Sequence, residues 1–303
     1  MKDYLSFNLD QEFVDTYRTK PEPFGYNGLG AVTFYRTYSR QKPDGSYESW
    51  CDVCDRVISG MYSIQKSHCI ANNRPWNDSK AQESAKEAFD RMFNFKWTPS
   101  GRGMWMVGTP FIHERKVAEA LMNCAFISTQ TIAEQRGLIF EWFMEMLMLG
   151  VGVGSDVRGE GEIKVSLPED IGETKGTVII VPDSREGWAQ SVGILINSYL
   201  PENIMYVISR HKVYFDYSQI RPAGAAIKGF GGISSGPEPL IKLHRRIREY
   251  MDKNAGFYIT TRTIVDIFNA IGACVIAGNV RRSAEIMFGD FGNEQFQNLK
   301  NYT

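Results

Sequence analysis

Cysteine is the residue type with the widest range of possible reactions in this sequence of 303 residues, which contains five cysteines. Cys51 and Cys54 form a CxxC pair, a spacing that can bind a metal ion or alternate between dithiol and disulfide. No second pair or histidine cluster stands at zinc-ligand spacing, and helical periodicity places Cys54 beside Trp50. We therefore interpret the pair, and also Cys69 and Cys274, as small buried side chains, and we predict no metal site.

Cys124 has a different setting. It lies in Met122-Asn-Cys-Ala-Phe126, after an expected helix and before the β-rich residues 126–129. Polar neighbours and a boundary between elements suit a thiol that a partner must reach. The local sequence by itself still favours a packed cysteine.

Groups that could bind an anion are the second kind of candidate. Two glycine clusters, at 150–154 and 229–236, could let backbone amides approach a phosphate. Neither matches a Walker loop or a dinucleotide-binding fingerprint, and a structural turn accounts for each equally well. Arg281 and Arg282 precede an expected strand, where they could clamp a phosphate or form an interdomain ion pair.

The charge balance narrows the class of partner. Lys and Arg number 34 against 35 Asp and Glu, a formal net charge of -1, so no global field favours nucleic acid or an anionic membrane. Residues 1–10 contain no apolar run of signal-peptide length, and the most apolar stretch, Leu138–Leu149, is too short to cross a bilayer. We expect a cytoplasmic protein that acts on small molecules and binds neither nucleic acid nor a membrane.

The spacing of apolar residues and the positions of capping residues, glycine and proline predict the helices, strands and loops. Capping-box spacings at Ser79–Gln82 and Thr131–Glu134 each predict a helix start. Gly150 predicts the end of the second of these helices, which leaves residues 151–156 as a loop. Further helices are expected at 49–58, 183–200, 240–253 and 263–277, strands at 213–217 and 283–288, and a long Gly- and Pro-rich loop at 221–239.

Helices alternate with strands in the second half of the chain, which is the pattern of an α/β domain. The first part is mostly helical. We therefore predict a helical region at residues 1–97 and an α/β domain at residues 98–303. Residue chemistry alone specifies an α/β protein with loops suited to anions, and no particular reaction.

Several strings resemble segments of the monomeric class II ribonucleoside-triphosphate reductases, in the same order along the chain. The longest runs from Gly224 to Pro237, and a second runs from Ala277 to Glu285. The others are Thr98-Pro-Ser-Gly-Arg102, Asn123-Cys-Ala-Phe126, the glycine pair Gly152 and Gly154, Asp183-Ser-Arg-Glu-Gly-Trp188 and Ile220-Arg-Pro222.

The resemblance implies a fold and a reaction. The fold is a ten-stranded α/β barrel made of two half-barrels, of which this chain would supply an N-terminal helical layer and the first half. The reaction converts ribonucleoside triphosphates to 2′-deoxyribonucleoside triphosphates. Homolysis of adenosylcobalamin makes a cysteine thiyl radical, which abstracts the ribose 3′-hydrogen, and two further cysteines reduce C2′.

Position by position, the resemblance makes Cys124 one of the two reducing cysteines, which end as a disulfide and are reduced again by a thioredoxin-like partner. This overturns the packed interpretation favoured by the local sequence. Ser100 and Asn123 would help to position the ribose or phosphates of the substrate.

Effector binding is implied for a region of about residues 150–183. Gly152, Gly154 and Asp156 look like the start of the loop that senses an effector nucleotide. Between Asp156 and Asp183 the connection is shorter than in the monomeric members, where an insertion builds the effector site within one chain.

In the family, the finger loop with the radical cysteine, the second reducing cysteine, most of the cobalamin site and the shuttle thiols follow further along the sequence. The resemblance therefore implies the N-terminal part of a split, intein-interrupted or truncated reductase that needs a C-terminal reductase half. The alternative is a non-catalytic nucleotide-binding remnant that regulates another reductase subunit.

Overall fold

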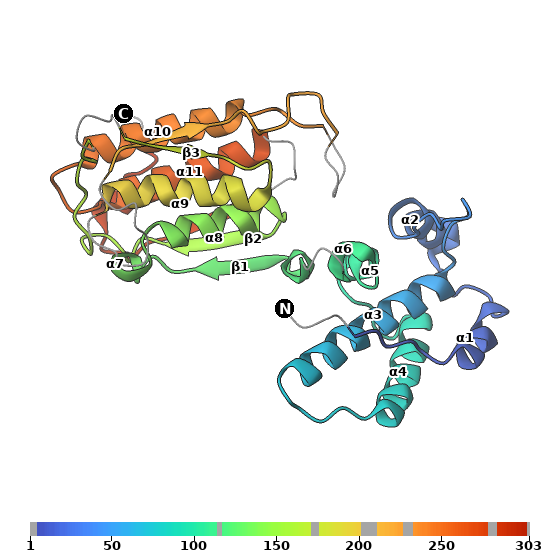
Figure 1. Cartoon of the computed structure of the whole chain (residues 1–303). Coiled ribbons are helices and arrows are strands. Elements are labelled where there is room, and N and C mark those ends of the chain that lie inside the picture. The colour runs from blue at the N-terminus through green and yellow to red at the C-terminus, as the bar shows by residue number, and fades with distance from the viewer. Residues whose placement is uncertain are drawn as a thin grey trace. The chain divides into compact units, whose positions relative to one another are not determined.

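The structure, a computed structural model, describes residues 5–113, 117–170, 176–200, 211–226, 233–277 and 284–301. The chain folds as two compact units, Met1–Met122 and Asn123–Thr303 (Figure 1). The first unit thus extends past the boundary predicted between residues 97 and 98. Across that boundary, the Arg56 guanidinium donates hydrogen bonds to the backbone carbonyls of Met104 (3.0 Å) and Val107 (2.6 Å).

The first unit is helical, as predicted. Its elements are α1 (Gln11–Arg18), the 3-10 turn η1 (Tyr26–Gly28), α2 (Leu29–Thr37), α3 (Trp50–Ala71), α4 (Asp78–Phe93), α5 (Gly101–Met106), α6 (Pro110–His113) and the 3-10 turn η2 (Ala118–Leu121). Aromatic rings fill its core. The Trp50 ring stacks on Phe95, with centroids 4.7 Å apart, and meets Phe34 edge-on at 5.5 Å.

The sequence predicts one helix start in this unit correctly and another incorrectly. Ser49 caps α3 through a capping box with Asp52, and the helix continues well beyond the predicted 49–58. The capping box predicted at Ser79–Gln82 is wrong, because Asn77 is the residue that caps α4 by accepting a hydrogen bond from Lys80 N (3.0 Å). Gln82 instead donates to the Asn8 carbonyl at 2.7 Å.

The second unit alternates strands with helices. Its elements are β1 (Cys124–Ile127), α7 (Ile132–Gln135), α8 (Gly137–Met148), β2 (Gly152–Asp156), β3 (Thr177–Ile180), α9 (Arg185–Tyr199), β4 (Val213–Asp216), α10 (Glu238–Asn254), α11 (Thr261–Ala277), β5 (Glu285–Phe288) and α12 (Glu294–Gln297). Strands β1, β2 and β5 form a parallel sheet in the order β1-β2-β5, and β3 pairs with β4, also in parallel. Parallel pairing needs crossover connections, which the helices supply.

One face of the β1-β2-β5 sheet carries the helical layer. Helices α8 and α11 contact the strands, and α9 and α10 pack on them (Figure 1). The rings of Phe140 and Phe143 on α8 lie 4.8 Å and 4.4 Å from that of Phe268 on α11. Helices α8 and α9 are in close contact where Gly137 faces Gly193.

The single helix predicted over 131–149 is two helices. Arg136 has a positive φ (50°) with a non-helical ψ (-122°), which separates α7 from α8. The Gly137 N–H at the start of α8 donates to Asn197 Oδ1 of α9 at 2.9 Å. The break therefore turns α8 so that its first turn lies against α9.

The loop predicted at 151–156 is wrong in a more consequential way, because Gly152–Asp156 is β2, the central strand of the three-stranded sheet. Val153 is 1% exposed and lies between neighbouring strands, which outweighs the low strand preference of the two glycines. The residues expected to start an effector loop thus belong to the sheet.

A buried histidine links three elements of this unit. Ser191 Oγ on α9 donates to the Trp188 carbonyl (2.7 Å), so it can only accept from Nε2 of His244 on α10 (3.0 Å). Nε2 therefore carries the ring proton, and Nδ1 accepts from the Tyr217 hydroxyl just after β4 (2.8 Å). Burial lowers the pKa of His244 to about 3.

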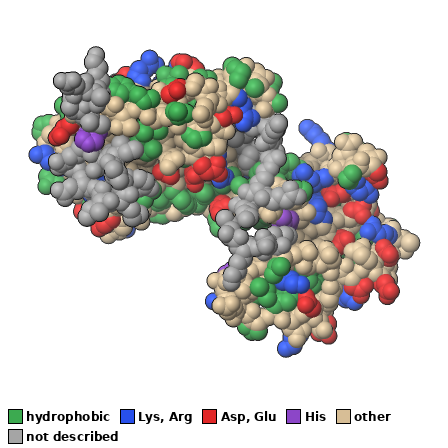
Figure 2. Space-filling model, in the orientation of Figure 1, with side chains coloured by type: hydrophobic (Ala, Val, Ile, Leu, Met, Phe, Trp, Pro, Cys, Tyr) green, Lys and Arg blue, Asp and Glu red, His purple; other side chains and the backbone are tan. Residues whose placement is uncertain are grey.

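Charged side chains of both signs are interspersed over the face of the molecule in Figure 2, in keeping with the net charge of -1. Among the residues with a described position, no helix is both long enough and apolar enough to cross a bilayer.

Candidate active site on the sheet face

The face of the β1-β2-β5 sheet away from the helices carries the predicted thiol. Side chains alternate along a strand, so Cys124 and Phe126 of β1 project to the same face. In the register, Cys124 pairs with Gly152 and Phe126 with Gly154. Because two glycines line β2 at these positions, the thiol and the ring have no side chain beside them on that strand.

Cys124 is exposed, so the packed interpretation of this residue is wrong. The other cysteines follow the prediction: Cys51, Cys54 and Cys274 are buried and Cys69 is half-buried. Burial raises the pKa of Cys51 to about 11 and that of Cys274 to about 12. Of the thiols, Cys124 is therefore the one placed for reaction with a partner in solution.

Two aromatic rings meet on this face beyond Cys124. The rings of Phe126 on β1 and Phe288 on β5 lie 6.0 Å apart across β2, although each residue is about half exposed (54% and 50%). They meet above Gly154, where an added Cβ would lie 2.9 Å from the Phe126 ring and 3.5 Å from that of Phe288. Gly154 is therefore required for the rings to form one continuous apolar surface, which we call the aromatic platform.

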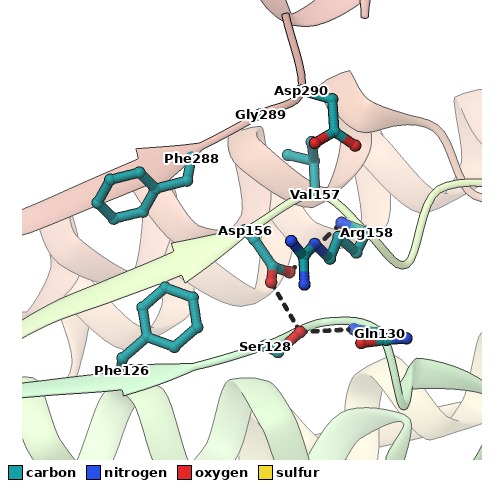
Figure 3. A pocket seen from close by; sticks show the side chains of 9 residues that line it. All are labelled: Phe126, Ser128, Gln130, Asp156, Val157, Arg158, Phe288, Gly289 and Asp290. Atoms are coloured by element: carbon teal, nitrogen blue, oxygen red, sulfur yellow. Dashed lines mark hydrogen bonds between the residues drawn. The ribbon is translucent and has the colours of Figure 1, made fainter.

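A pocket of about 460 Å³ adjoins the platform at the carboxyl ends of the three strands (Figure 3). This is the edge at which open parallel sheets bind ligands. Its wall is partly aromatic and its rim is polar. The lining residues are Phe126, Ser128, Gln130, Asp156, Val157, Arg158, Phe288, Gly289 and Asp290.

Asp156 holds the ends of β1 and β2 together beneath this pocket. Its carboxylate accepts from Ser128 Oγ (2.7 Å), from the N–H (2.8 Å) and Oγ1 (2.9 Å) of Thr129, and from Arg158 N (3.3 Å). The side chain is 5% exposed. A carboxylate with four donors has little capacity left for a ligand, so its position in the structure indicates a bracing role.

We predict that Asp156→Asn destabilises the second unit by about 1–3 kcal/mol, because an amide N–H₂ would face donors in a buried site. Urea unfolding followed by circular dichroism measures the loss. Asp290→Asn, a change of the same kind at an exposed pocket residue, is the control and should leave the transition in place. Equal transitions for wild type and Asp156→Asn would contradict the bracing role.

The two predicted substrate residues lie in different units, Ser100 within the first and Asn123 at the start of the second. Ser100 is exposed and caps α5, accepting a hydrogen bond from Gly103 N at 3.3 Å. Asn123 is exposed and opens the second unit, with its carbonyl accepting from Gly152 N at 2.8 Å. Arg102 donates to the carbonyls of Ala120 (3.2 Å) and Met122 (3.1 Å), which orients the peptide that leads into Asn123.

The predicted loop at 221–239 is partly described. Arg221 Nε donates to Asp183 Oδ2 at 2.8 Å, so the segments around 183–188 and 220–222 meet in space. Residues 227–232 of the loop, and Arg281 and Arg282, lie outside the described residues.

Glu285 is a half-buried acidic residue on the helix-covered face of the sheet that sequence reasoning did not single out. It lies on β5 facing α11, where an added Cβ at Gly272 would stand 2.8 Å from Glu285 Oε2. Among the described residues this oxygen has no hydrogen-bond partner. Burial raises the pKa of Glu285 to about 7.

The raised pKa of Glu285 predicts a pH-dependent stability. An unfolded glutamate titrates at about 4.3 and the folded one at about 7, so the folded state binds the proton more tightly. This contribution is complete below about pH 4.3 and is lost as the pH rises to about 7. Glu285→Gln should therefore raise the melting temperature at about pH 8 and change it little near pH 4, whereas exposed Glu249→Gln should do neither. Parallel melting curves for wild type and Glu285→Gln over this range would contradict it.

Comparison with known proteins identifies the family of the chain. Residues 9–109 match the sequence model of the ribonucleotide reductase alpha domain, and residues 166–251 match that of the insertion domain of B12-dependent ribonucleotide reductase. The insertion-related region thus extends well beyond the connection between Asp156 and Asp183.

Relatives similar over almost the whole chain carry reductase names. An adenosylcobalamin-dependent ribonucleoside-triphosphate reductase of Euglena gracilis is 42% identical over 98% of this chain, and a probable one of Dictyostelium discoideum is 41% identical over 98%. The enzyme of Lactobacillus leichmannii is 29% identical over 97%, in an alignment of 338 positions that requires gaps in this chain. The chain spans 40% of the length of the first two relatives and 45% of the third.

A solved structure agrees with these relatives. The crystal structure of a B12-dependent class II ribonucleotide reductase superimposes on 98% of this chain and 46% of its own, with a TM-score of 0.76 and 27% identity. This confirms the predicted α/β fold, which is a partial barrel in this chain. The chain belongs to the adenosylcobalamin-dependent ribonucleotide reductase family and corresponds to the N-terminal portion of its longer members.

Proposed function

We propose that this chain forms the part of a ribonucleoside-triphosphate reductase that presents one reducing thiol, Cys124, to the ribose of the substrate. The exposed position of Cys124 on the open sheet face carries the proposal. Similarity to reductases along 98% of the chain favours this function over a non-catalytic regulatory remnant.

The proposed role of Cys124 is a two-electron reduction. Cys124 and a second cysteine, which the remaining reductase sequence supplies, are oxidised to a disulfide. The C2′–O bond of the ribose breaks and the hydroxyl group leaves as water with one of the two thiol protons, while the other thiol hydrogen forms the new C2′–H bond. A thioredoxin-like dithiol then reduces the disulfide by exchange.

Ser100 and Asn123 are proposed to position the ribose or phosphates. Both side chains are exposed, and Asn123 directly precedes Cys124, so its amide can reach a ligand that contacts the thiol. Gly152 and Gly154 keep the floor of the site free of side chains. We also propose that the region of residues 150–183 binds an effector nucleotide. The carboxylate of Asp156 would support this site by bracing the sheet.

Adenosylcobalamin, the cofactor named for the relatives, would supply the initiating radical when bound. The pocket on the sheet face, about 460 Å³, has the size for a nucleoside but not for a corrin ring. The described residues do not form a cobalamin site by themselves. We therefore assign no step through this group to them and expect the C-terminal reductase half to hold it.

The test combines this chain with a C-terminal reductase half, adenosylcobalamin, a ribonucleoside triphosphate and a dithiol. We expect the matching 2′-deoxyribonucleoside triphosphate to accumulate beyond one equivalent per enzyme, as measured by chromatography. The chain alone is the matched control and should make none. No deoxynucleotide from the complete mixture would contradict the proposed function.

A further inference from the structure

The aromatic platform lies within reach of a nucleotide bound at Cys124. Phe126 follows Cys124 by two residues on the same face of β1, a separation of about 7 Å at the rise of a β-strand. The base of a nucleoside is attached to C1′, next to the C2′ carbon that the thiol reduces. A ribose beside Cys124 therefore places its base one ring further along the sheet, over the platform or in the opposite direction.

The two directions along the strand differ in chemistry. Toward the amino end of β1 the chain leads to exposed, polar Asn123. Toward the carboxyl end the ligand meets the rings of Phe126 and Phe288, which are about half exposed, are tilted by 57° to each other and form an apolar surface above Gly154. A heteroaromatic base gains from stacking on such a surface, whichever base it is.

The pocket beyond the platform has free polar groups at its rim. Ser128 Oγ is occupied, since it donates to Asp156 and accepts from Gln130 N at 3.1 Å. In contrast, among the described residues no hydrogen bond or ion pair engages the side-chain amide of Gln130, the guanidinium of Arg158 or the carboxylate of Asp290. These three groups provide donors and acceptors next to the platform, at the carboxyl ends of the strands, where the polar edge of a stacked base would lie (Figure 3).

We infer that Phe126 and Phe288 form the subsite on which the base of the substrate stacks, with the edge of the base turned toward Gln130, Arg158 and Asp290. This inference rests on the proposed function, because it takes the position of the ribose from Cys124. The platform accepts any base, and the rim groups distinguish one base from another.

The experiment compares a substrate that has a base with one that lacks it. In the complete reductase we would measure KM and kcat for ATP, and the inhibition constant of ribose 5-triphosphate, for wild type, Phe126→Leu and Phe126→Tyr. Leucine retains apolar bulk without an aromatic face, and tyrosine retains the face. We expect Phe126→Leu to raise KM for ATP about tenfold and to leave the inhibition constant of ribose 5-triphosphate unchanged, while Phe126→Tyr stays within about twofold of wild type.

Three further variants complete the comparison. Gly154→Ala would put a methyl group 2.9 Å from the Phe126 ring, so it should displace that ring and raise KM for ATP, as Phe126→Leu does. Phe291→Leu changes a ring that is 95% exposed and outside the pocket, and it should leave both constants unchanged. Phe288→Leu gives a second reading if Phe126→Leu fails to fold.

Equal effects of Phe126→Leu on ATP and ribose 5-triphosphate, or no effect on either, would overturn the base subsite. The first result would indicate a general disturbance of the sheet, and the second would indicate that the rings are covered by the remaining reductase sequence. If wild type makes no deoxynucleotide, the proposed function fails. Equilibrium dialysis of ATP and ribose 5-triphosphate against the same variants then decides the subsite without turnover.

Discussion

Replacing Cys124 with serine is expected to abolish multiple turnover by the complete reductase, with a fall of about three orders of magnitude or more in deoxynucleotide formation. Serine differs from cysteine by one atom and cannot form a disulfide, so it cannot deliver its share of the two electrons. Cys124 is exposed, and the residue that pairs with it on β2 is a glycine, so the substitution should not disturb packing. The measurement is product per enzyme over many equivalents of dithiol.

Cys69→Ser is the matched control, because Cys69 is half-buried on α3 in the other unit and has no proposed role. It should retain wild-type turnover. Thiol alkylation supplies a second readout: exposed Cys124 should react with iodoacetamide before the buried Cys51, Cys54 and Cys274. Sustained turnover by Cys124→Ser would exclude this residue as a reducing thiol.

Gly137→Ala should have the largest effect on the stability of the second unit. A Cβ at Gly137 would lie 2.3 Å from the Gly193 carbonyl oxygen and 3.0 Å from Asn197 Oδ1. Both atoms belong to α9, and a backbone carbonyl in a helix cannot move aside alone. The helices would have to separate and weaken the hydrogen bond from Gly137 N to Asn197 Oδ1. We expect a loss of about 3 kcal/mol, which corresponds to a melting temperature lower by roughly 6–12 °C.

Gly292→Ala is the control for this substitution, since an added Cβ there meets no heavy atom within 4 Å. It adds the same methyl group to the same unit without a steric cost. Differential scanning calorimetry of the two variants separates the packing effect from the general effect of losing a glycine. Similar melting temperatures for both variants would show that α8 and α9 adjust more freely than their contact suggests.

The elements with regular apolar periodicity could be predicted from the sequence, and those that depend on distant contacts could not. Helices α10 and α11 lie where apolar periodicity and the glycine after each helix predict them. The sequence predicts a loop in place of β2 because Gly152 and Gly154 have low strand preference, and only pairing on both sides by β1 and β5 makes the segment a strand. The break at Arg136 likewise depends on α9, which lies more than forty residues further along the chain.

The candidate site likewise has features that the sequence predicts and features that depend on distant contacts. Cys124 could be singled out from the strings around it, although local composition favoured burial, because exposure depends on which face of the sheet the helices cover. The ion pair between Asp183 and Arg221 joins two segments that were recognised separately. The contact of Phe126 with Phe288 depends on the β1-β2-β5 order, which brings together residues from opposite ends of the unit.

The chain of hydrogen bonds through His244 has a consequence for spectroscopy. Its direction runs from the Tyr217 hydroxyl through the ring to Ser191 and the Trp188 carbonyl, so the imidazole is held as one tautomer. With a pKa of about 3, the ring should give nitrogen chemical shifts that stay constant across the neutral range, and its Nε2 proton should exchange slowly with solvent. His244 thus provides an internal reference signal for the folded second unit, against which a titration of Glu285 can be followed in the same sample.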